Sequence, residues 1–152
     1  MNYSETYGDL VYMAKNGDFD LIAHGCNCKK NMGAGIAKTI AGKFPMAYQT
    51  DINSTPKMGE ISVCENYSDC VIVNAYTQLY PGKGGHGKDT EFHRYEAIRN
   101  SMREINNRFS GKHIGLPLIG CGLAGLQWSK VKKIIKEELK DLDVTIVKYK
   151  KQ

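Results

Sequence analysis

Two glycine-rich segments constrain this chain more than any other feature. Each lies between an apolar run and a stretch with helical periodicity. The first runs from Gly33 to Ile36 and the second from Gly120 to Gly125. Glycine lets the backbone approach a ligand closely, and the free N–H groups at the start of a following helix face an anion. The segments therefore indicate strand–turn–helix units that suit a phosphate, although such glycines often make only tight connections. Neither segment completes a Walker motif or a Gly-x-Gly-x-x-Gly motif.

The pattern around these segments predicts alternating strands and helices. Five short apolar runs read as buried strands, at 19–26, 61–64, 70–75, 113–119 and 144–149. Between 90 and 109, apolar residues recur at steps of three or four, which is typical of one stripe of a helix; a second helix follows the second glycine segment. Strands that alternate with helices predict an α/β fold with a largely parallel sheet covered on both faces. Ligands of such sheets bind beyond the carboxyl ends of the strands.

Length and composition indicate one domain over residues 1–152. The chain has 41% hydrophobic and 24% charged residues, which is the ordinary range of a globular domain with one core. No apolar stretch approaches the roughly 18 residues that span a bilayer, and the first residues lack the features of a signal peptide. We therefore expect a cytoplasmic protein that does not enter a membrane.

The cysteines and the net charge point to no further partner. The five cysteines are odd in number and scattered, so we expect reduced thiols. Cys26 and Cys28 lack the second pair that a four-ligand zinc site needs, so we expect no metal ion and no cofactor. The net charge of +5 suits a polyanionic ligand, but many of the lysines fall on one helix face and in the basic tail. We therefore expect no nucleic-acid partner.

Four ordered blocks resemble the macrodomain superfamily over nearly the whole chain. They are the stretches 8–10, 23–27, 32–37 and 117–123, the last followed by Gln127 and Trp128. The likeness is strongest to the branch that includes ADP-ribose-1″-phosphate phosphatases and terminal ADP-ribose protein glycohydrolases. It implies a single three-layer α/β/α macrodomain with a mixed, largely parallel central sheet. The implied ligand is free ADP-ribose or ADP-ribose-1″-phosphate. An ADP-ribosylated protein is a further possible partner that the resemblance implies.

The resemblance also assigns roles to residues. Asp9 resembles the aspartate that accepts a hydrogen bond from the adenine amine, with a plain turn aspartate as the alternative. Asn27 resembles the asparagine that holds the distal ribose, and an Asx turn is compatible with that role. Tyr149 is placed to stack on the base, although a partly exposed strand tyrosine is equally common. The expected ligand-binding set is Asp9, Leu10, Asn27, Gly33, Ala34, Gly35, Ile36, Gly120, Cys121, Gly122, Leu123, Ala124 and Tyr149, with the two glycine segments clamping the diphosphate through backbone N–H groups.

The chain departs from the glycohydrolases of this branch at two positions. Those enzymes are known for a lysine nucleophile after the central strand and for an aspartate in the second loop. Here the stretch 74–78 contains no lysine, and Ala124 occupies the loop position. Alanine cannot act as an acid or base, and Gln78 cannot form a Schiff base, so we expect the lysine route to be closed.

Histidines supply the remaining candidates for catalysis. His86 lies in a Gly-Gly-His-Gly stretch that resembles the phosphatase sub-branch, where a histidine can act as acid or base. Its alternative is an exposed loop residue. Asp89 is expected to be the N-cap of the following helix rather than a catalytic group. His24 is a second candidate, with a buried core histidine as the alternative. The predicted catalytic set is therefore Asn27, His86 and His24.

Three functions remain open at this point. The first is a phosphatase that acts on ADP-ribose-1″-phosphate with water as the nucleophile. The second is a non-catalytic reader of ADP-ribose, and the third is a glycohydrolase that uses water held by the substrate.

Overall fold

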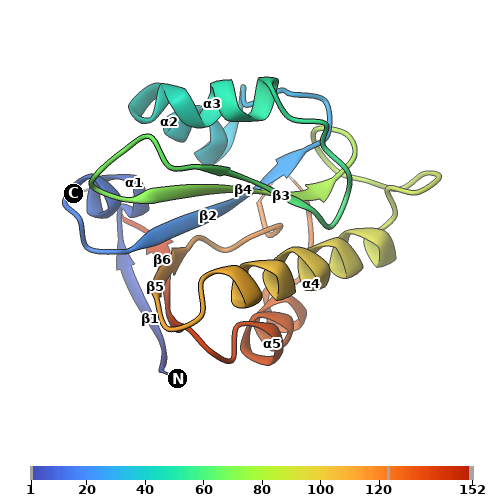
Figure 1. Ribbon diagram of the computed structural model, residues 1–152. Helices are drawn as coiled ribbons and strands as arrows, with labels where there is room; N and C mark the ends of the chain where they lie inside the picture. Colours follow the sequence, from blue (N-terminus) through green and yellow to red (C-terminus); the bar gives the residue numbers. More distant parts are fainter. Residues whose placement is uncertain (1, 123, 151–152) are drawn as a thin grey trace.

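The computed structural model describes residues 2–122 and 124–150 of the chain. The prediction of an α/β fold is confirmed (Figure 1). The strands and helices are, in chain order, β1 (Tyr3–Gly8), α1 (Leu10–Lys15), β2 (Leu21–Asn27), α2 (Gly35–Lys43), α3 (Pro45–Ile52), β3 (Ile61–Cys64), β4 (Val71–Gln78), α4 (Glu91–Arg108), β5 (His113–Leu116), α5 (Trp128–Glu138) and β6 (Asp143–Tyr149).

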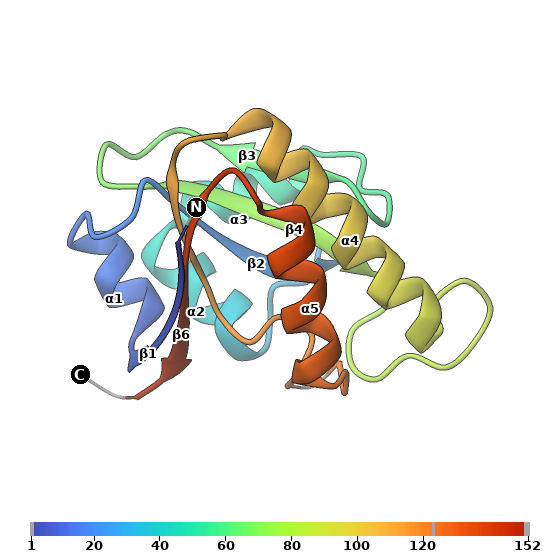
Figure 2. The same ribbon diagram turned by 90° about the horizontal axis from the view of Figure 1, so that it is seen from below.

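The strands form one mixed sheet in the order β1-β6-β5-β2-β4-β3. All neighbours are parallel except β3 and β4, which form an antiparallel pair at one edge. Figures 1 and 2 show α2 and α3 over one face of the sheet, with α4 and α5 over the other. The expected three-layer arrangement is thus confirmed.

Each face of the sheet has its own apolar core. On the α4 and α5 side, Leu21, Ile114 and Ile146 of the strands pack with Ile98 and Ile135 of the helices. On the other side, apolar residues of β2 and β4 pack with buried side chains of α1, α2 and α3. Burial on both faces explains why the central strands read as continuous apolar runs in the sequence.

Three elements were not predicted, and their sequences explain why. β1 is an edge strand with the polar sequence Tyr-Ser-Glu-Thr-Tyr-Gly and only its last residue buried. α1 and α3 have six and eight residues, too short for a periodic pattern to stand out. These elements still matter, because β1 carries the chain to Asp9 at the carboxyl edge of the sheet.

The parallel strands bring the predicted site to one edge. Asn27 and Gln78 end β2 and β4, Pro117 follows β5, and Tyr149 ends β6. Asp9 follows β1 at the same edge. Within the described residues, no helix is long and apolar enough to cross a membrane.

Candidate functional site

A groove of two adjoining pockets lies at this edge of the sheet. We call the first the β4 pocket; it has a volume of about 380 Å³. The second, the β6 pocket, has a volume of about 480 Å³. Residues from both glycine-rich segments, and from the stretch after β5, belong to both pockets: Gly35, Ile36, Pro117, Leu118 and Gly122. The glycine segments therefore meet where the two pockets join.

The first glycine segment opens directly into a helix. α2 begins at Gly35, and within the described chain no side chain caps it at Ala34. The N–H groups of the first helical turn are therefore open to an anionic ligand. Gly35 has φ +58°, a conformation that glycine adopts without strain. Upstream, the Asn31 side chain accepts a hydrogen bond from the Gly33 N–H at 3.0 Å, which fixes the turn.

The second glycine segment is a turn that is not followed at once by a helix. Gly120 and Gly125 have φ +74° and +77°. The Leu126 N–H donates to the Gly120 carbonyl at 2.7 Å and closes the turn. α5 begins only at Trp128 and belongs to neither pocket. Of the predicted clamp residues in this segment, Leu123 lies outside the described residues.

Asn27 is held at the floor of the β4 pocket by backbone contacts. Its Nδ2 donates to the Asn31 carbonyl at 2.8 Å, and its Oδ1 accepts from the Lys29 N–H at 2.9 Å. This is the Asx turn considered in the sequence analysis, and the side chain still lines the pocket. The conformation leaves one amide hydrogen and an oxygen lone pair for a ligand hydroxyl.

The β6 pocket combines apolar walls with one carboxylate and one exposed ring. Asp9 caps α1, with its Oδ1 accepting from the Tyr12 N–H at 3.1 Å. Leu10 is buried, and Tyr149 is 75% exposed. All of these except Tyr12 line the pocket, together with Val147 and Cys121. Partial burial raises the pKa of the Cys121 thiol to about 11, so it stays protonated at neutral pH.

His24 does not belong to the groove. It is fully buried and its Nε2 lies 2.7 Å from Oδ1 of Asn74, its partner on β4. Burial lowers the pKa of the imidazole to about 4, with the hydrogen bond that the ring donates to Asn74 Oδ1 acting in the opposite direction. We therefore correct the expectation that His24 takes part in catalysis, because no atom of a fully buried ring can meet a substrate. The interpretation as a core histidine is the one that the structure supports.

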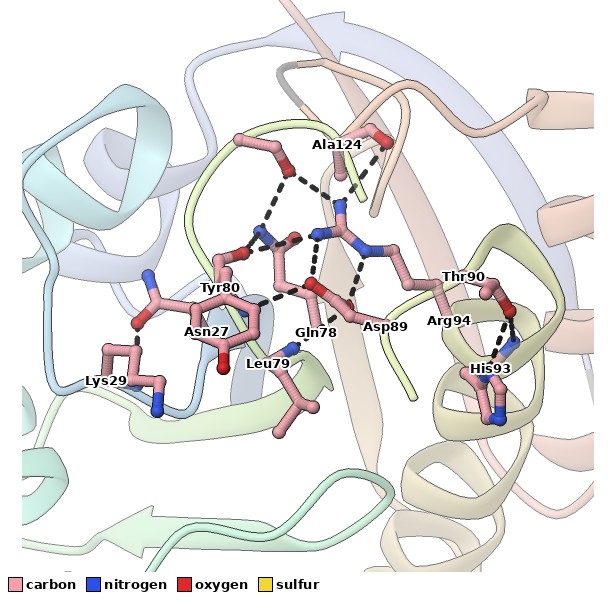
Figure 3. Close-up of polar contacts among 11 residues, drawn as sticks. Asn27, Lys29, Gln78, Leu79, Tyr80, Asp89, Thr90, His93, Arg94 and Ala124 are labelled. Carbon is pink, nitrogen blue, oxygen red and sulfur yellow. Dashed lines mark hydrogen bonds and ion pairs between the residues drawn. The ribbon is translucent and has the colours of Figure 1, made fainter. Parts of the chain in front are cut away.

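The loop between β4 and α4 also differs from expectation. His86 is exposed in this loop and belongs to the lining of neither pocket. The prediction that Asp89 caps α4 is wrong, because the N-cap is Thr90, whose hydroxyl accepts from the His93 N–H. Asp89 instead forms a buried ion pair with Arg94, with 2.8 Å between Oδ2 and Nη2 (Figure 3).

Sequence reasoning missed this ion pair and the role of Gln78. Residues five apart do not share a helix face, so nothing in the pattern pairs Asp89 with Arg94. Gln78 lines the β4 pocket, and its Nε2 donates to the Tyr80 carbonyl at 2.7 Å. The amide therefore fixes the loop that leaves β4 (Figure 3).

The β4 pocket is nearly free of ionisable groups. Among the described residues that line it, only the Cys26 thiol can titrate, and burial raises its pKa well above the ordinary value. The described residues hold no cluster of three or more histidine, cysteine or acidic side chains that suits a metal ion. Among the described residues, backbone groups, side-chain amides and the Thr77 hydroxyl are thus the polar groups that line this pocket.

Known proteins resemble the chain over most of its length. A family described as Macro domain matches residues 23–135. A 17.5 kDa protein from the tk-vs intergenic region of Enterobacteria phage T4 is 31% identical, with 93% of each chain covered. The ADP-ribose glycohydrolase OARD1 of Homo sapiens is 29% identical over 93% of this chain and 87% of its own. The ADP-ribose 1″-phosphate phosphatase of Saccharomyces cerevisiae is 23% identical over 83% and 88%.

Solved structures agree with the fold. A protein of unknown function from Bacteroides thetaiotaomicron superposes with a TM-score of 0.77 at 27% identity. The superposition covers 97% of this chain and 98% of that protein.

Proposed function

The chain belongs to the Macro domain family, and from this premise we propose that it binds ADP-ribose and releases phosphate from ADP-ribose-1″-phosphate. One observation carries the proposal: two pockets, of about 380 and 480 Å³, join where both glycine segments line them. A ligand with two ribosyl ends and a central diphosphate matches that arrangement. Relatives named for ADP-ribose hydrolysis and for phosphate release support the choice of ligand.

The proposed orientation places adenosine in the β6 pocket. Asp9 is the carboxylate there, and it would accept a hydrogen bond from the adenine amine. The diphosphate would cross the shared region and meet N–H groups at the start of α2 and in the second glycine segment. The distal ribose would then enter the β4 pocket beside Asn27.

In the proposed reaction, water attacks the phosphorus of the 1″-phosphate. A bond forms between the water oxygen and phosphorus, and the bond from phosphorus to the ribose oxygen breaks. The proton given up by water passes to that oxygen, with His86 as the proposed acid or base. His86 sits between Gly85 and Gly87, both with positive φ, in a loop that would have to close over the β4 pocket to bring the ring to the phosphate.

Phosphate release from ADP-ribose-1″-phosphate, followed by malachite green, tests the activity. At saturating substrate, we expect His86→Ala to lower the rate by about 10²-fold. Lys88→Ala, in the same exposed loop, is the matched control and should keep the rate. Asn27→Ala should lower turnover more than Asp9→Ala, because the distal ribose is next to the reacting phosphate and the adenine is not.

A second candidate is a reader of ADP-ribose, or a glycohydrolase that uses water held by the substrate. The scarcity of ionisable groups in the β4 pocket favours it. Binding of ADP-ribose without any phosphate release would replace the phosphatase by this alternative. Incubation with an ADP-ribosylated protein would then separate the reader from the glycohydrolase, because only the latter frees ADP-ribose.

A further inference from the structure

The ion pair between Asp89 and Arg94 is buried next to the groove. The two side chains are 2% and 1% exposed, and the contact is bidentate, with 2.9 Å from Nε to Oδ1 and 2.8 Å from Nη2 to Oδ2. Burial alone would raise the pKa of the Asp89 carboxyl, but the hydrogen bonds from Arg94 and from two backbone N–H groups lower it below its ordinary value. Arg94 cannot touch a ligand in the groove, since almost none of it is accessible.

The pair fixes the segment that follows β4. Asp89 accepts from the N–H groups of Leu79 and Tyr80 at 3.0 and 3.1 Å. Arg94 donates to the carbonyl of Tyr80 at 3.2 Å and to that of Gly82 at 2.7 Å. Gly82 and the intervening Pro81 line the β4 pocket. The Arg94 guanidinium therefore fixes segment 80–82, which forms one wall of the pocket.

The same guanidinium also reaches a second wall of the pocket. Its Nη1 lies 3.4 Å from the carbonyl of Ala124, in the second glycine segment (Figure 3). Ala124 also lines the β4 pocket. Arg94 thus contacts segment 80–82 and the second glycine segment at once, although they are about 40 residues apart in the chain.

Packing around the pair is tight enough to constrain the sequence. A Cβ added to Gly84 would lie 2.7 Å from Arg94 Nε, and closer still to the Asp89 carbonyl. Both distances are too short for a real contact, so any side chain at position 84 must displace the pair or the loop. The glycine is needed for space, which is an observation independent of the hydrogen bonds.

From these contacts we propose that Arg94 is a positioning residue that fixes the shape of the β4 pocket and so selects for ligands with a distal ribose. Paired with Asp89, it holds segment 80–82 at a fixed distance from the second glycine segment. This inference rests on the proposed function for the identity of the ligand. None of the described residues that line the β6 pocket shares a hydrogen bond with the pair, so the adenosine end of the groove should not depend on it.

The test compares two ligands in Arg94→Met, measured by isothermal titration. ADP-ribose occupies both pockets, whereas AMP occupies the β6 pocket alone. We expect ADP-ribose to bind about tenfold or more weakly, while AMP keeps its affinity. Arg99→Met is the matched control, because Arg99 lies on the same helix but pairs with Glu137 and Glu138 of α5. It should leave both affinities unchanged.

A second variant guards against misfolding. Removing one partner of a buried pair leaves an isolated charge, so Arg94→Met can lower stability by itself. The double variant Arg94→Met with Asp89→Asn removes that charge, and the amide oxygen can still accept from the Leu79 N–H. The double variant should lose affinity for ADP-ribose to the same extent as Arg94→Met and keep its affinity for AMP. Equal losses for both ligands, or no loss for ADP-ribose, would overturn the inference.

Hydrogen exchange keeps the inference separate from the proposed function. In Arg94→Met we expect faster amide exchange in segments 79–84 and 120–125, with no ligand present. If the wild-type protein binds neither ligand, the proposed function fails, while this measurement still decides whether Arg94 holds the two walls. Faster exchange throughout α4, with both loop segments unchanged, would reject the positioning role.

Discussion

The two pockets of the groove are built in different ways. Behind the β4 pocket lie buried polar groups whose bonds cross between elements, such as His24 with Asn74 and Arg94 with Asp89. The β6 pocket rests largely on apolar side chains, and its carboxylate, Asp9, belongs to a local helix cap. Buried polar pairs demand specific geometry, whereas apolar contacts tolerate small shifts. The β4 pocket should therefore be the rigid, selective end and the β6 pocket the adaptable one.

The largest expected effect is a loss of ligand binding in both pockets, caused by a change at Gly122. Gly122 lines both, its position has open space, and its φ is not positive, so the fold should accept a side chain there. In Gly122→Glu, a carboxylate would face the diphosphate, and we expect binding of ADP-ribose and AMP to fall by at least about 10²-fold. Thermal melts with and without ligand measure this, and the melting temperature without ligand should not change.

Gly42→Glu is the control for that variant. Gly42 is exposed in α2, also has open space around it, and lines neither pocket. Gly35→Val is less informative, because φ +58° strains a β-branched side chain and mixes loss of fold with loss of binding. A ligand-induced shift that survives in Gly122→Glu would exclude the second glycine segment from the phosphate site.

The next effect concerns stability beneath the β4 pocket. The pKa of His24 falls from 6.5 to about 4 in the folded protein, so the unfolded chain binds the extra proton between these values. The contribution of His24 to the free energy of unfolding is therefore fully present above pH 6.5. It falls by up to about 3 kcal/mol as the pH decreases toward 4. Urea titrations between pH 4 and 7 should show this loss in the wild-type protein.

His24→Gln tests whether that slope belongs to His24. The glutamine amide can still donate to Asn74 and does not titrate, so stability should vary much less over the same interval. His113→Gln serves as the control, because His113 is only partly buried and its ring pairs with Thr145 near the opposite ends of the strands. An unchanged slope in His24→Gln would assign the acid sensitivity to other groups.

The contrast between the pockets also explains what the sequence could predict. The central strands, the long helix α4 and both glycine segments follow from apolar periodicity and turn chemistry, which are local signals. Asn27 and Asp9 were predicted as site residues from family motifs at strand ends, and that assignment stays a prediction. His24 and Asp89 were misjudged because their partners, Asn74 and Arg94, are chosen by tertiary packing.

Two details of the groove have the same origin. The helix after the second glycine segment was expected to start close to it, but α5 begins only at Trp128, after the turn has closed. Gln78 reads in the sequence only as a missing lysine, yet its amide binds the loop carbonyls of Tyr80 and Gly82. The order of residues in a sequence does not show which backbone carbonyl a side chain will bond in the folded protein.

At the adaptable end, Asp9 should have an intermediate effect. Asp9→Ala should weaken ADP-ribose and AMP alike by about 1–3 kcal/mol, because the adenine amine loses its acceptor. The same change removes the cap of α1 and should lower the melting temperature. Asp9→Ser keeps a capping oxygen but withdraws the carboxylate, so its melting temperature should recover while its binding does not. Recovery of both would show that Asp9 acts only as a cap.

The smallest effect is expected at Tyr149, the last residue of β6. Its ring is 75% exposed at the rim of the β6 pocket, so stacking on adenine would still leave one face in water. We expect Tyr149→Ala to weaken AMP and ADP-ribose by about 1 kcal/mol, and Tyr149→Phe to change neither, because stacking needs the ring and not the hydroxyl. Tyr12→Ala is the control, since Tyr12 is also exposed but does not line the pocket. Titrations with AMP test this prediction. An unaltered affinity in Tyr149→Ala would mean that Asp9 and the apolar walls hold the base without the ring. A loss much above ~1 kcal/mol would make the β6 pocket as selective as the β4 pocket and remove the difference between them.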